Sequence, residues 1–262
     1  MSDYMTMPLK QFAKELAADG IVDEGEVRKI RRRIYADGSI ERDEADFLFS
    51  LNNAVSGANN HPSWNRLFVE ALTDHFLGDK KSPGEVDSDE ASYLIRKVKG
   101  DGRVDEAELA LLVNIVTEAK KVAAKLHKYL LSSLKSAVLD DGVIDKSEVE
   151  MIRKVVFCEG GSGGAGVSRD EAEFLFCLND GTSGKTNHAS WKRLFVEALT
   201  SHVLDDDDSP GVVDGPEAKW LIARTMADGK VDGNERALLA AIKRKAKSLD
   251  PKLAAEMVRL KI

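Results

Sequence analysis

Apolar residues recur along most of this chain at the three- and four-residue spacing that places them on one face of a helix. The segment SWNRLFVEALTDH, residues 63–75, is a clear case. Its continuous stripe consists of Trp64, Leu67, Phe68, Ala71, Leu72 and His75. The stripe predicts a helix with one buried face, on which the histidine points inward. The many Ala, Leu, Glu, Lys and Arg residues favour helices throughout, so we expect an all-α fold.

A short motif, D/P-G-x-I/V-D-x-x-E, separates the predicted helices. It recurs with some variation from residues 19, 37, 83 and 101, and again from residues 141, 165, 210 and 228. Glycine suits the left-handed position after a helix C-terminus, because it has no Cβ to clash there. The Asp or Ser that follows can cap the next helix, and the Glu three residues later can complete a capping box. Each copy therefore predicts one helix end and the next helix start.

Much of the chain is repeated once. SWNRLFVEALTDH at 63–75 returns as SWKRLFVEALTSH at 190–202, a shift of 127 residues, and RDEADFLFSLNNAVSG returns as RDEAEFLFCLNDGTSG. Earlier in each half the shift is 122, since the second half carries a five-residue insertion in the glycine-rich stretch 159–166. The repeat predicts two homologous helical bundles, residues 1–122 and 123–262.

The junction of the two halves contains no glycine or proline from residue 105 until Gly142. We expect one long helix, or two nearly collinear ones, to join the halves over about 105–140. At the matching place in the second half, Asp250-Pro251 interrupts the pattern. A short terminal helix is expected over 251–261.

Composition limits the classes of function. The formal net charge of −7 makes nucleic acid a poor electrostatic partner. No apolar run reaches the roughly 20 residues that a membrane span requires, and there is no apolar stretch typical of a secretion signal. The two cysteines, Cys158 and Cys177, have no metal-type spacing and fit a reducing compartment. We expect a cytoplasmic protein, for which peripheral membrane association stays open, as does the oligomeric state.

One copy of the motif could bind a metal ion. Counting back from Glu217 as position 12 of a calcium-type loop places oxygen ligands at most of the required positions. The candidate ligands are Asp206, Asp208, the carbonyl of Val212, Asp214 and Glu217. Calcium or another hard divalent cation would suit this set. The matching loop at 79–90 has Lys81 in place of the second acid, and we expect it to bind more weakly or not at all.

A reading without metal explains the same residues. Asp214 can cap the helix that follows, and Glu217 can serve as the N3 residue of a capping box. In the other copies most residues at positions 1 and 3 of a calcium loop, such as Arg33 and Tyr35, cannot ligate a hard cation. Capping accounts for those copies without a ligand.

Repeated helix ends of the form D-G-x-I/V-D-x-x-E-x-x-x-L in an acidic, all-helical chain resemble the TerB-like group, tellurite resistance protein B and its relatives. This resemblance implies a compact helical bundle, a cytoplasmic or membrane-associated role in stress, and divalent-metal binding through acidic residues. The tandem pair and the SWxRLFVEALTxH segment depart from a single domain of that group.

His75 and His202 invite a catalytic interpretation, but no carboxylate or nucleophile is signalled beside either one. We expect both to be hydrogen-bonded core or interface histidines, and His61 and His188 to be turn residues. The sequence therefore favours a protein that is not an enzyme. The two main hypotheses are a TerB-like, stress-associated protein that binds a divalent cation, and a helical scaffold that binds unidentified protein partners without metal. An enzyme comes third, because it would need reactive groups that converge from both halves, for instance His75 with His202.

Overall fold

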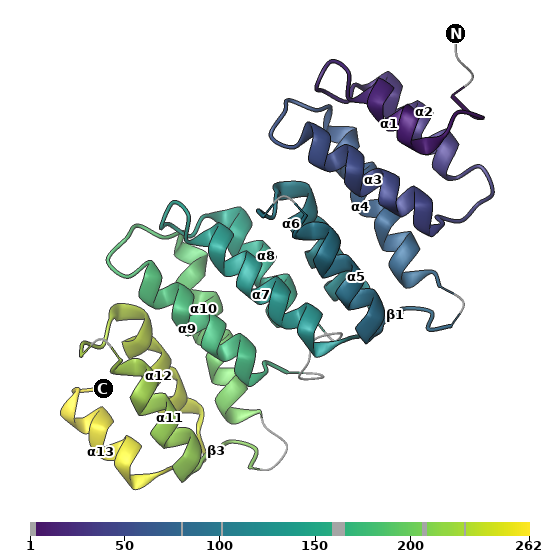
Figure 1. Ribbon diagram of the computed structural model, residues 1–262. Coiled ribbons are helices and arrows are strands. Elements are labelled where there is room, and N and C mark those ends of the chain that lie inside the picture. The colour runs from purple at the N-terminus through teal and green to yellow at the C-terminus, as the bar shows by residue number, and fades with distance from the viewer. Residues whose placement is uncertain (1–3, 80, 101, 159–165, 206–208, 228) are drawn as a thin grey trace. The chain divides into compact units, whose positions relative to one another are not determined.

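The computed structural model describes residues 4–79, 81–100, 102–158, 166–205, 209–227 and 229–262. Within these ranges the chain forms thirteen helices and four strands of two residues each, so the fold is all-α (Figure 1). The chain divides into two compact units, Met1–Leu130 and Leu131–Ile262. The predicted boundary after residue 122 lies just ahead of the helix in which this division falls.

The helices of the first unit are α1 (Leu9–Leu16), α2 (Glu24–Ile34), α3 (Arg42–Val55), α4 (Pro62–Leu77), α5 (Ser88–Val98) and α6 (Glu106–Glu118), followed by the start of α7 (Ala124–Val138). The second unit contains the end of α7, then α8 (Lys146–Val156), α9 (Arg169–Gly181), α10 (Ala189–Leu204), α11 (Gly215–Thr225), α12 (Gly233–Lys245) and α13 (Pro251–Arg259). In the first unit α4 packs against α2, α3 and α6, and in the second α10 packs against α8, α9 and α12.

Eight helices begin at the predicted capping motif. In seven of them the N-cap side chain accepts a hydrogen bond from a backbone N–H in the first turn. In the eighth, α3, Glu44 Oε2 accepts from the backbone N–H of Glu41 at 2.9 Å. The hydrophobic residue before the cap is buried in six of the eight, as Val22 and Ile144 illustrate, and is half-buried before α6 and α12. The motif glycines Gly20 and Gly102 have φ values of 78° and 85°, so the left-handed turn is confirmed.

The predicted long helix over 105–140 is wrong as one continuous element. Helix α6 ends at Glu118, and strand β2 (Lys121–Val122) precedes α7. Strand β2 pairs in parallel with β1 (Glu85–Val86), and the backbone N–H of Lys120 donates to the carbonyl of Gly84 at 2.8 Å. This pairing takes backbone groups that a continuous helix would need, and so tertiary context overrides helix propensity here.

In the second unit the helical pattern is interrupted in the same way, at the place that Pro251 predicted. Strand β3 (Val212–Val213) pairs in parallel with β4 (Ser248–Leu249), and α13 begins directly at Pro251. Helix α13 packs on α11. In the part of the chain that the structure describes, no helix has the length and apolar character needed to cross a bilayer.

The cores of both units are built on the predicted stripe. The stripe residues before the histidine are fully buried in α4, and their counterparts in α10 are at most 1% exposed. These counterparts are Trp191, Leu194, Phe195, Ala198 and Leu199. The central helix of each unit therefore contributes most of one face to the core and leaves its other side to the surface.

Candidate functional site

The predicted metal loop is only partly described by the structure, because Asp206 and Asp208 lie outside the described residues. Asp214 and Glu217 form a complete capping box at the start of α11. Asp214 Oδ1 accepts from the backbone N–H of Glu217 at 2.8 Å, and Glu217 Oε2 accepts from the backbone N–H of Asp214 at 3.0 Å. Each carboxylate therefore uses one of its oxygens to accept a hydrogen bond at the start of α11.

A lysine occupies the other side of this loop. Lys247 Nζ donates to the carbonyl of Pro210 at 3.0 Å, and its side chain lies against Gly211, where an added Cβ would be 3.1 Å from it. Gly211 has a φ of 80°, so it combines a left-handed backbone with this close approach. An ammonium group at this place opposes a divalent cation by charge. Among the described residues, no three His, Cys, Asp or Glu side chains group closely enough to hold a metal ion.

The matching loop of the first unit is built in the same way. Asp87 caps α5, and the backbone N–H groups of Glu90 and Asp89 lower the pKa of its carboxyl. Burial raises the pKa of Glu90, and the neighbouring carboxylates of Asp87 and Asp79 add to this effect. Lys120 lies against Gly84 as Lys247 lies against Gly211. Both loops are therefore capped turns with a lysine beside them.

The two histidines of the repeated segment make matching contacts with the backbone. His75 Nδ1 lies 2.7 Å from the carbonyl of Ile40, and His202 Nδ1 lies 2.7 Å from that of Val167. Burial lowers the pKa of His202, which favours its neutral form with the Nδ1 proton on the carbonyl. Each histidine joins its helix to the turn before α3 or α9, as expected of a hydrogen-bonded core residue.

His61 and His188 are N-cap residues, which confirms the predicted turns. The Nδ1 of His61 accepts from the backbone N–H of Ser63 at 3.3 Å, and that of His188 accepts from Ser190 at 3.4 Å. The residue before each histidine is an asparagine that binds the capping turn of an earlier helix. In the first unit, Asn60 Oδ1 accepts from the backbone N–H of Val22 at 2.8 Å. These histidines thus belong to the framework that holds two turns together.

A polar and aromatic cluster beside α5 was missed by the sequence analysis. Tyr93 donates its hydroxyl proton to Asp46 at 2.5 Å, and Lys97 forms an ion pair with Asp46 at 2.7 Å. Arg42 stacks over the Tyr93 ring at 4.1 Å. Burial and the Asp46 carboxylate raise the pKa of Tyr93, so its phenol stays protonated. The cluster therefore ties α3 to α5 as a structural contact.

The same cluster recurs in the second unit with larger side chains. Trp220 Nε1 donates to Glu173 at 2.6 Å, Arg224 Nε lies 3.2 Å from Glu173, and Arg169 stacks over the indole at 4.0 Å. Tyr, Asp and Lys have changed together to Trp, Glu and Arg, at positions 127 residues apart. An alignment of the two halves shows this joint change, and it could have identified the contact between α3 and α5 from the sequence.

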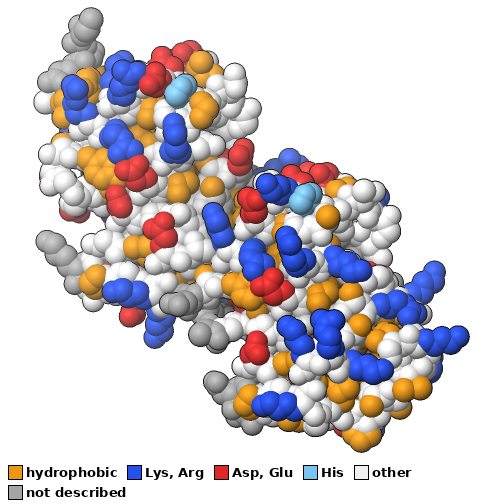
Figure 2. Space-filling view, turned by 180° about the vertical axis from the view of Figure 1, so that it is seen from behind, with side chains coloured by type: hydrophobic (Ala, Val, Ile, Leu, Met, Phe, Trp, Pro, Cys, Tyr) orange, Lys and Arg blue, Asp and Glu red, His pale blue; other side chains and the backbone are white. Residues whose placement is uncertain are grey.

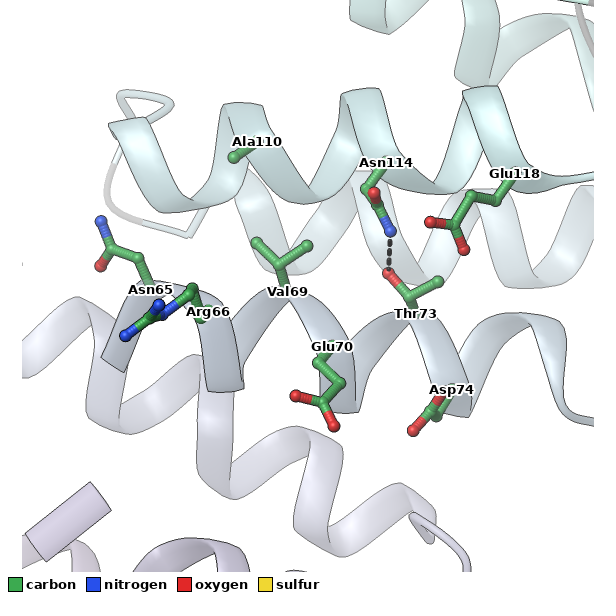
Figure 3. A pocket seen from close by; sticks show the side chains of 9 residues that line it. All are labelled: Asn65, Arg66, Val69, Glu70, Thr73, Asp74, Ala110, Asn114 and Glu118. Carbon is green, nitrogen blue, oxygen red and sulfur yellow. Dashed lines mark hydrogen bonds between the residues drawn. The ribbon is translucent and has the colours of Figure 1, made fainter. Parts of the chain in front are cut away.

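The first unit has an open groove of about 430 Å³ between α4 and α6. Figure 3 shows Thr73 and Asn114 pointing toward each other across it, and Asn114 Nδ2 donates to Thr73 Oγ1 at 3.0 Å. The groove also has Asn65 at one end and Glu118 at the other. In its wall, Glu70 forms an ion pair with Arg31, and Asp74 accepts a hydrogen bond from the Tyr35 hydroxyl at 2.6 Å.

The matching face of α10 and α12 has a different charge. Lys192 stands at the position of Asn65, Lys245 at that of Glu118, and Ala241 at that of Asn114. Lys192 and Lys245 are exposed, as is Arg244. Figure 2 shows Lys and Arg side chains gathered on one face of the second unit, at the lower right. Matched helices therefore present a mostly neutral to acidic groove in one unit and a basic face in the other.

Comparisons of the chain with models of protein families, with curated proteins and with solved structures found no match. The resemblance to the TerB-like group therefore stays a prediction from the sequence motif.

Proposed function

We propose that this chain is a non-enzymatic helical scaffold, whose two units bind different protein partners through differently charged faces. One observation carries the proposal. The internal contacts of α4 and α10 recur at matched positions, whereas the exposed residues beside them change charge. A difference between the partners of the two units would account for the change from Asn65 to Lys192 and from Glu118 to Lys245.

The recurring contacts can be followed pair by pair. Arg31 donates to Glu70 from both terminal guanidinium nitrogens, Nη1 and Nη2, and Arg153 donates to Glu197 in the same manner. Beside them, Glu118 of α6 is replaced by Lys245 of α12. This combination is typical of an interaction protein, in which a constant framework presents a variable surface.

Affinity capture with surface variants tests the proposal. The native protein, Asn65→Lys/Glu118→Lys and Lys192→Asn/Lys245→Glu would each be immobilised and exposed to a lysate of cells that express the protein. We expect each variant to lose a different protein that the native chain retains, and the purified proteins to bind directly. The proposal fails if neither variant loses anything that the native chain holds.

A second candidate function is that of a TerB-like, stress-associated protein that takes Ca²⁺ or a similar cation in the acidic loop. The sequence DDDDSPGVVDGPE, residues 205–217, supports it, because hard cations prefer carboxylate and carbonyl oxygens. Cation binding would require Glu217 to leave the backbone N–H of Asp214, and the Lys247 ammonium to move from the carbonyl of Pro210. Metal affinity is therefore expected to be modest.

Calorimetric titration of Ca²⁺, Mg²⁺, Mn²⁺ and Zn²⁺ into chelator-stripped protein separates the two candidates. If the loop binds Ca²⁺, the melting temperature should rise in millimolar Ca²⁺ by mass action on the native state, and Glu217→Gln should abolish the rise. The matched variant Glu90→Gln in the first-unit loop should leave it intact. If none of the four ions gives a heat of binding, the metal-binding function is excluded and the scaffold function remains.

A further inference from the structure

The basic face of the second unit has features that its counterpart lacks. It is formed by α10 and α12, with Lys192 and Arg193 on the first helix and Arg244 and Lys245 on the second. All four side chains are exposed, and within the described residues none forms a hydrogen bond or an ion pair within 4 Å. Arg193 and Lys245 act on the Glu197 carboxylate at longer range and lower its pKa after the larger effect of Arg153, so the four cations are only partly compensated.

Small residues lie between these cations. Ala237 and Ala240 of α12 are accessible, and Val196 of α10 is half-buried beside them. Helix axes approach most closely where the side chains at the contact are small. A partner helix could therefore lie along this face with its backbone near α12 and its own charged side chains reaching the cations.

The buried end of this face contains a hydroxyl group that no other residue satisfies. Thr200 is 4% exposed, and its Oγ1 has no hydrogen-bond partner in the described structure. At the matched position Thr73 lines the groove of the first unit, where Asn114 donates to its hydroxyl. In the second unit Asn114 is replaced by Ala241. The second unit therefore has an unpaired polar atom just beneath this face, where the first unit has a hydrogen bond.

We propose that the α10/α12 face binds an acidic helix of a partner protein. Its carboxylates would meet Lys192, Arg193 and Lys245. This inference rests on the proposed scaffold function and gives the second unit a partner of defined chemistry.

The surroundings of the face favour a protein helix over two other anionic partners. The large hydrophobic side chains that the described chain exposes, Ile21, Phe157 and Val258, lie outside α10 and α12, so the face offers no side chain for insertion into a bilayer. The carboxylate of Glu197 lies on the same helix as Lys192, and the chain has a net charge of −7. Both repel any anionic partner, but a duplex with one phosphate charge per roughly 1.7 Å is repelled more strongly than a helix with one carboxylate per turn of about 5.4 Å.

A synthetic helical peptide with glutamates along one face is the probe, and its glutamine counterpart is the matched control. In calorimetry at low salt, the glutamate peptide should bind the full-length protein and the glutamine peptide should not. Lys192→Asn/Lys245→Glu, which installs the residues of the first unit, should weaken binding about tenfold. The control Lys154→Asn/Lys219→Glu makes the same change in net charge on α8 and α11 and should leave the affinity unchanged.

Ala241→Asn tests the role of Thr200. It would supply the hydrogen-bond donor present in the first unit, so we expect a higher melting temperature with unchanged peptide binding, because the hydroxyl lies beneath the face. Equal binding of both peptides would overturn the inference, as would equal weakening by the control variant. Binding of phosphatidylserine vesicles or duplex DNA in place of the glutamate peptide would also overturn it. If the peptide fails while cellular partners are still captured, this inference alone is wrong and the scaffold function stands.

Discussion

Trp64 in the first unit and Trp191 in the second stand at matched, buried positions, yet the hydrogen bonding of their indole nitrogens differs. Trp64 Nε1 donates to Asn52 at 3.3 Å. In the second unit Asn179 matches Asn52, but its amide oxygen accepts from Asn234 at 2.8 Å, and Trp191 Nε1 has no partner among the described residues. Asn234 replaces Ala107 at the start of the helix. One substitution near the surface has therefore redirected a buried hydrogen bond without changing the helices.

The difference teaches which parts of the repeated unit are fixed. Capping boxes, the histidine contacts and the buried stripe recur in both units. The exposed positions of α4/α6 and α10/α12, and the polar atoms just beneath them, have diverged. A framework held by caps and core can thus present two different surfaces, and the following substitutions test how far the units remain equivalent.

The largest effect is expected from the core of the two central helices. Phe68→Ala and Phe195→Ala remove fully buried rings at matched positions, and each should lower the free energy of unfolding by about 3–5 kcal/mol. Denaturant unfolding followed by fluorescence resolves the units, because Trp64 belongs to the first and Trp191 and Trp220 to the second. A cost below about 1 kcal/mol in one unit would show that the cores are not equivalent.

Helix caps that also join two helices should come next. Asp105 accepts from the backbone N–H of Glu108 and from Asn52 and Ser56, all at 2.8 Å, while Asp232 accepts from Asn179 at 2.8 Å. Asp105→Ala and Asp232→Ala should each cost about 2 kcal/mol. Asp23→Ala, a cap without such a contact to another helix, is the control and should cost about 1 kcal/mol.

Thermal melts of the three proteins give the comparison. Similar melting temperatures for Asp23→Ala and Asp105→Ala would argue that the bonds to Asn52 and Ser56 add nothing to stability.

The helix starts were predictable from the sequence because capping is local. The end of one helix and the start of the next are specified within eight residues, by a Gly, a hydrophobic residue, an Asp or Ser, and a Glu. The break after Glu118 was not predictable from its own neighbourhood, because it depends on pairing with Gly84 and Val86 far along the chain. The matching break in the second unit was predicted, because Pro251 begins the helix that follows it. The helix that follows the break in the first unit begins at Ala124, which gives no such signal.

The candidate site was less predictable than the fold. The acidic residues of the 79–90 and 206–217 loops suggested a metal, but the sequence could not show that Lys247 would donate to the carbonyl of Pro210. Nor could the spacing show that Thr73 and Asn114 meet across a groove, because they lie on separate helices. Contacts between residues on separate helices can be identified only once the packing of those helices is known. Residues that change together between the two halves are the one indication of such contacts in the sequence.

A smaller effect is expected from the exposed ion pairs. Arg31 lowers the pKa of Glu70, and Arg153 lowers that of Glu197. A depressed pKa in the folded state adds stability above the unfolded value of about 4.3, and this stability is lost as the pH falls through the folded value. Arg31→Met and Arg153→Met should each cost less than about 1 kcal/mol at neutral pH, because both pairs are half exposed to solvent.

Unfolding at pH 7 and at about pH 3 checks this dependence. The difference between each variant and the native protein should shrink in acid, and a difference that grows would contradict the assigned pairs.

The smallest effect is expected from Asn234→Ala. This change restores the residue of the first unit and frees the oxygen of Asn179 for the indole of Trp191. One neutral hydrogen bond replaces another, so the free energy of unfolding should change by less than about 0.5 kcal/mol. A shift of the fluorescence maximum would report the new bond, and a loss of more than about 1 kcal/mol would show that the indole cannot take it.

The central claim is that matched helices differ in function because of a few residues on one face. The most direct measurement is the stoichiometry of the glutamate peptide on Asn65→Lys/Asn114→Ala/Glu118→Lys, which gives α4/α6 three of the residues that distinguish α10/α12. Calorimetry should find one peptide per native chain and two per variant chain. The same single site in both proteins, or no binding to either, would contradict the account.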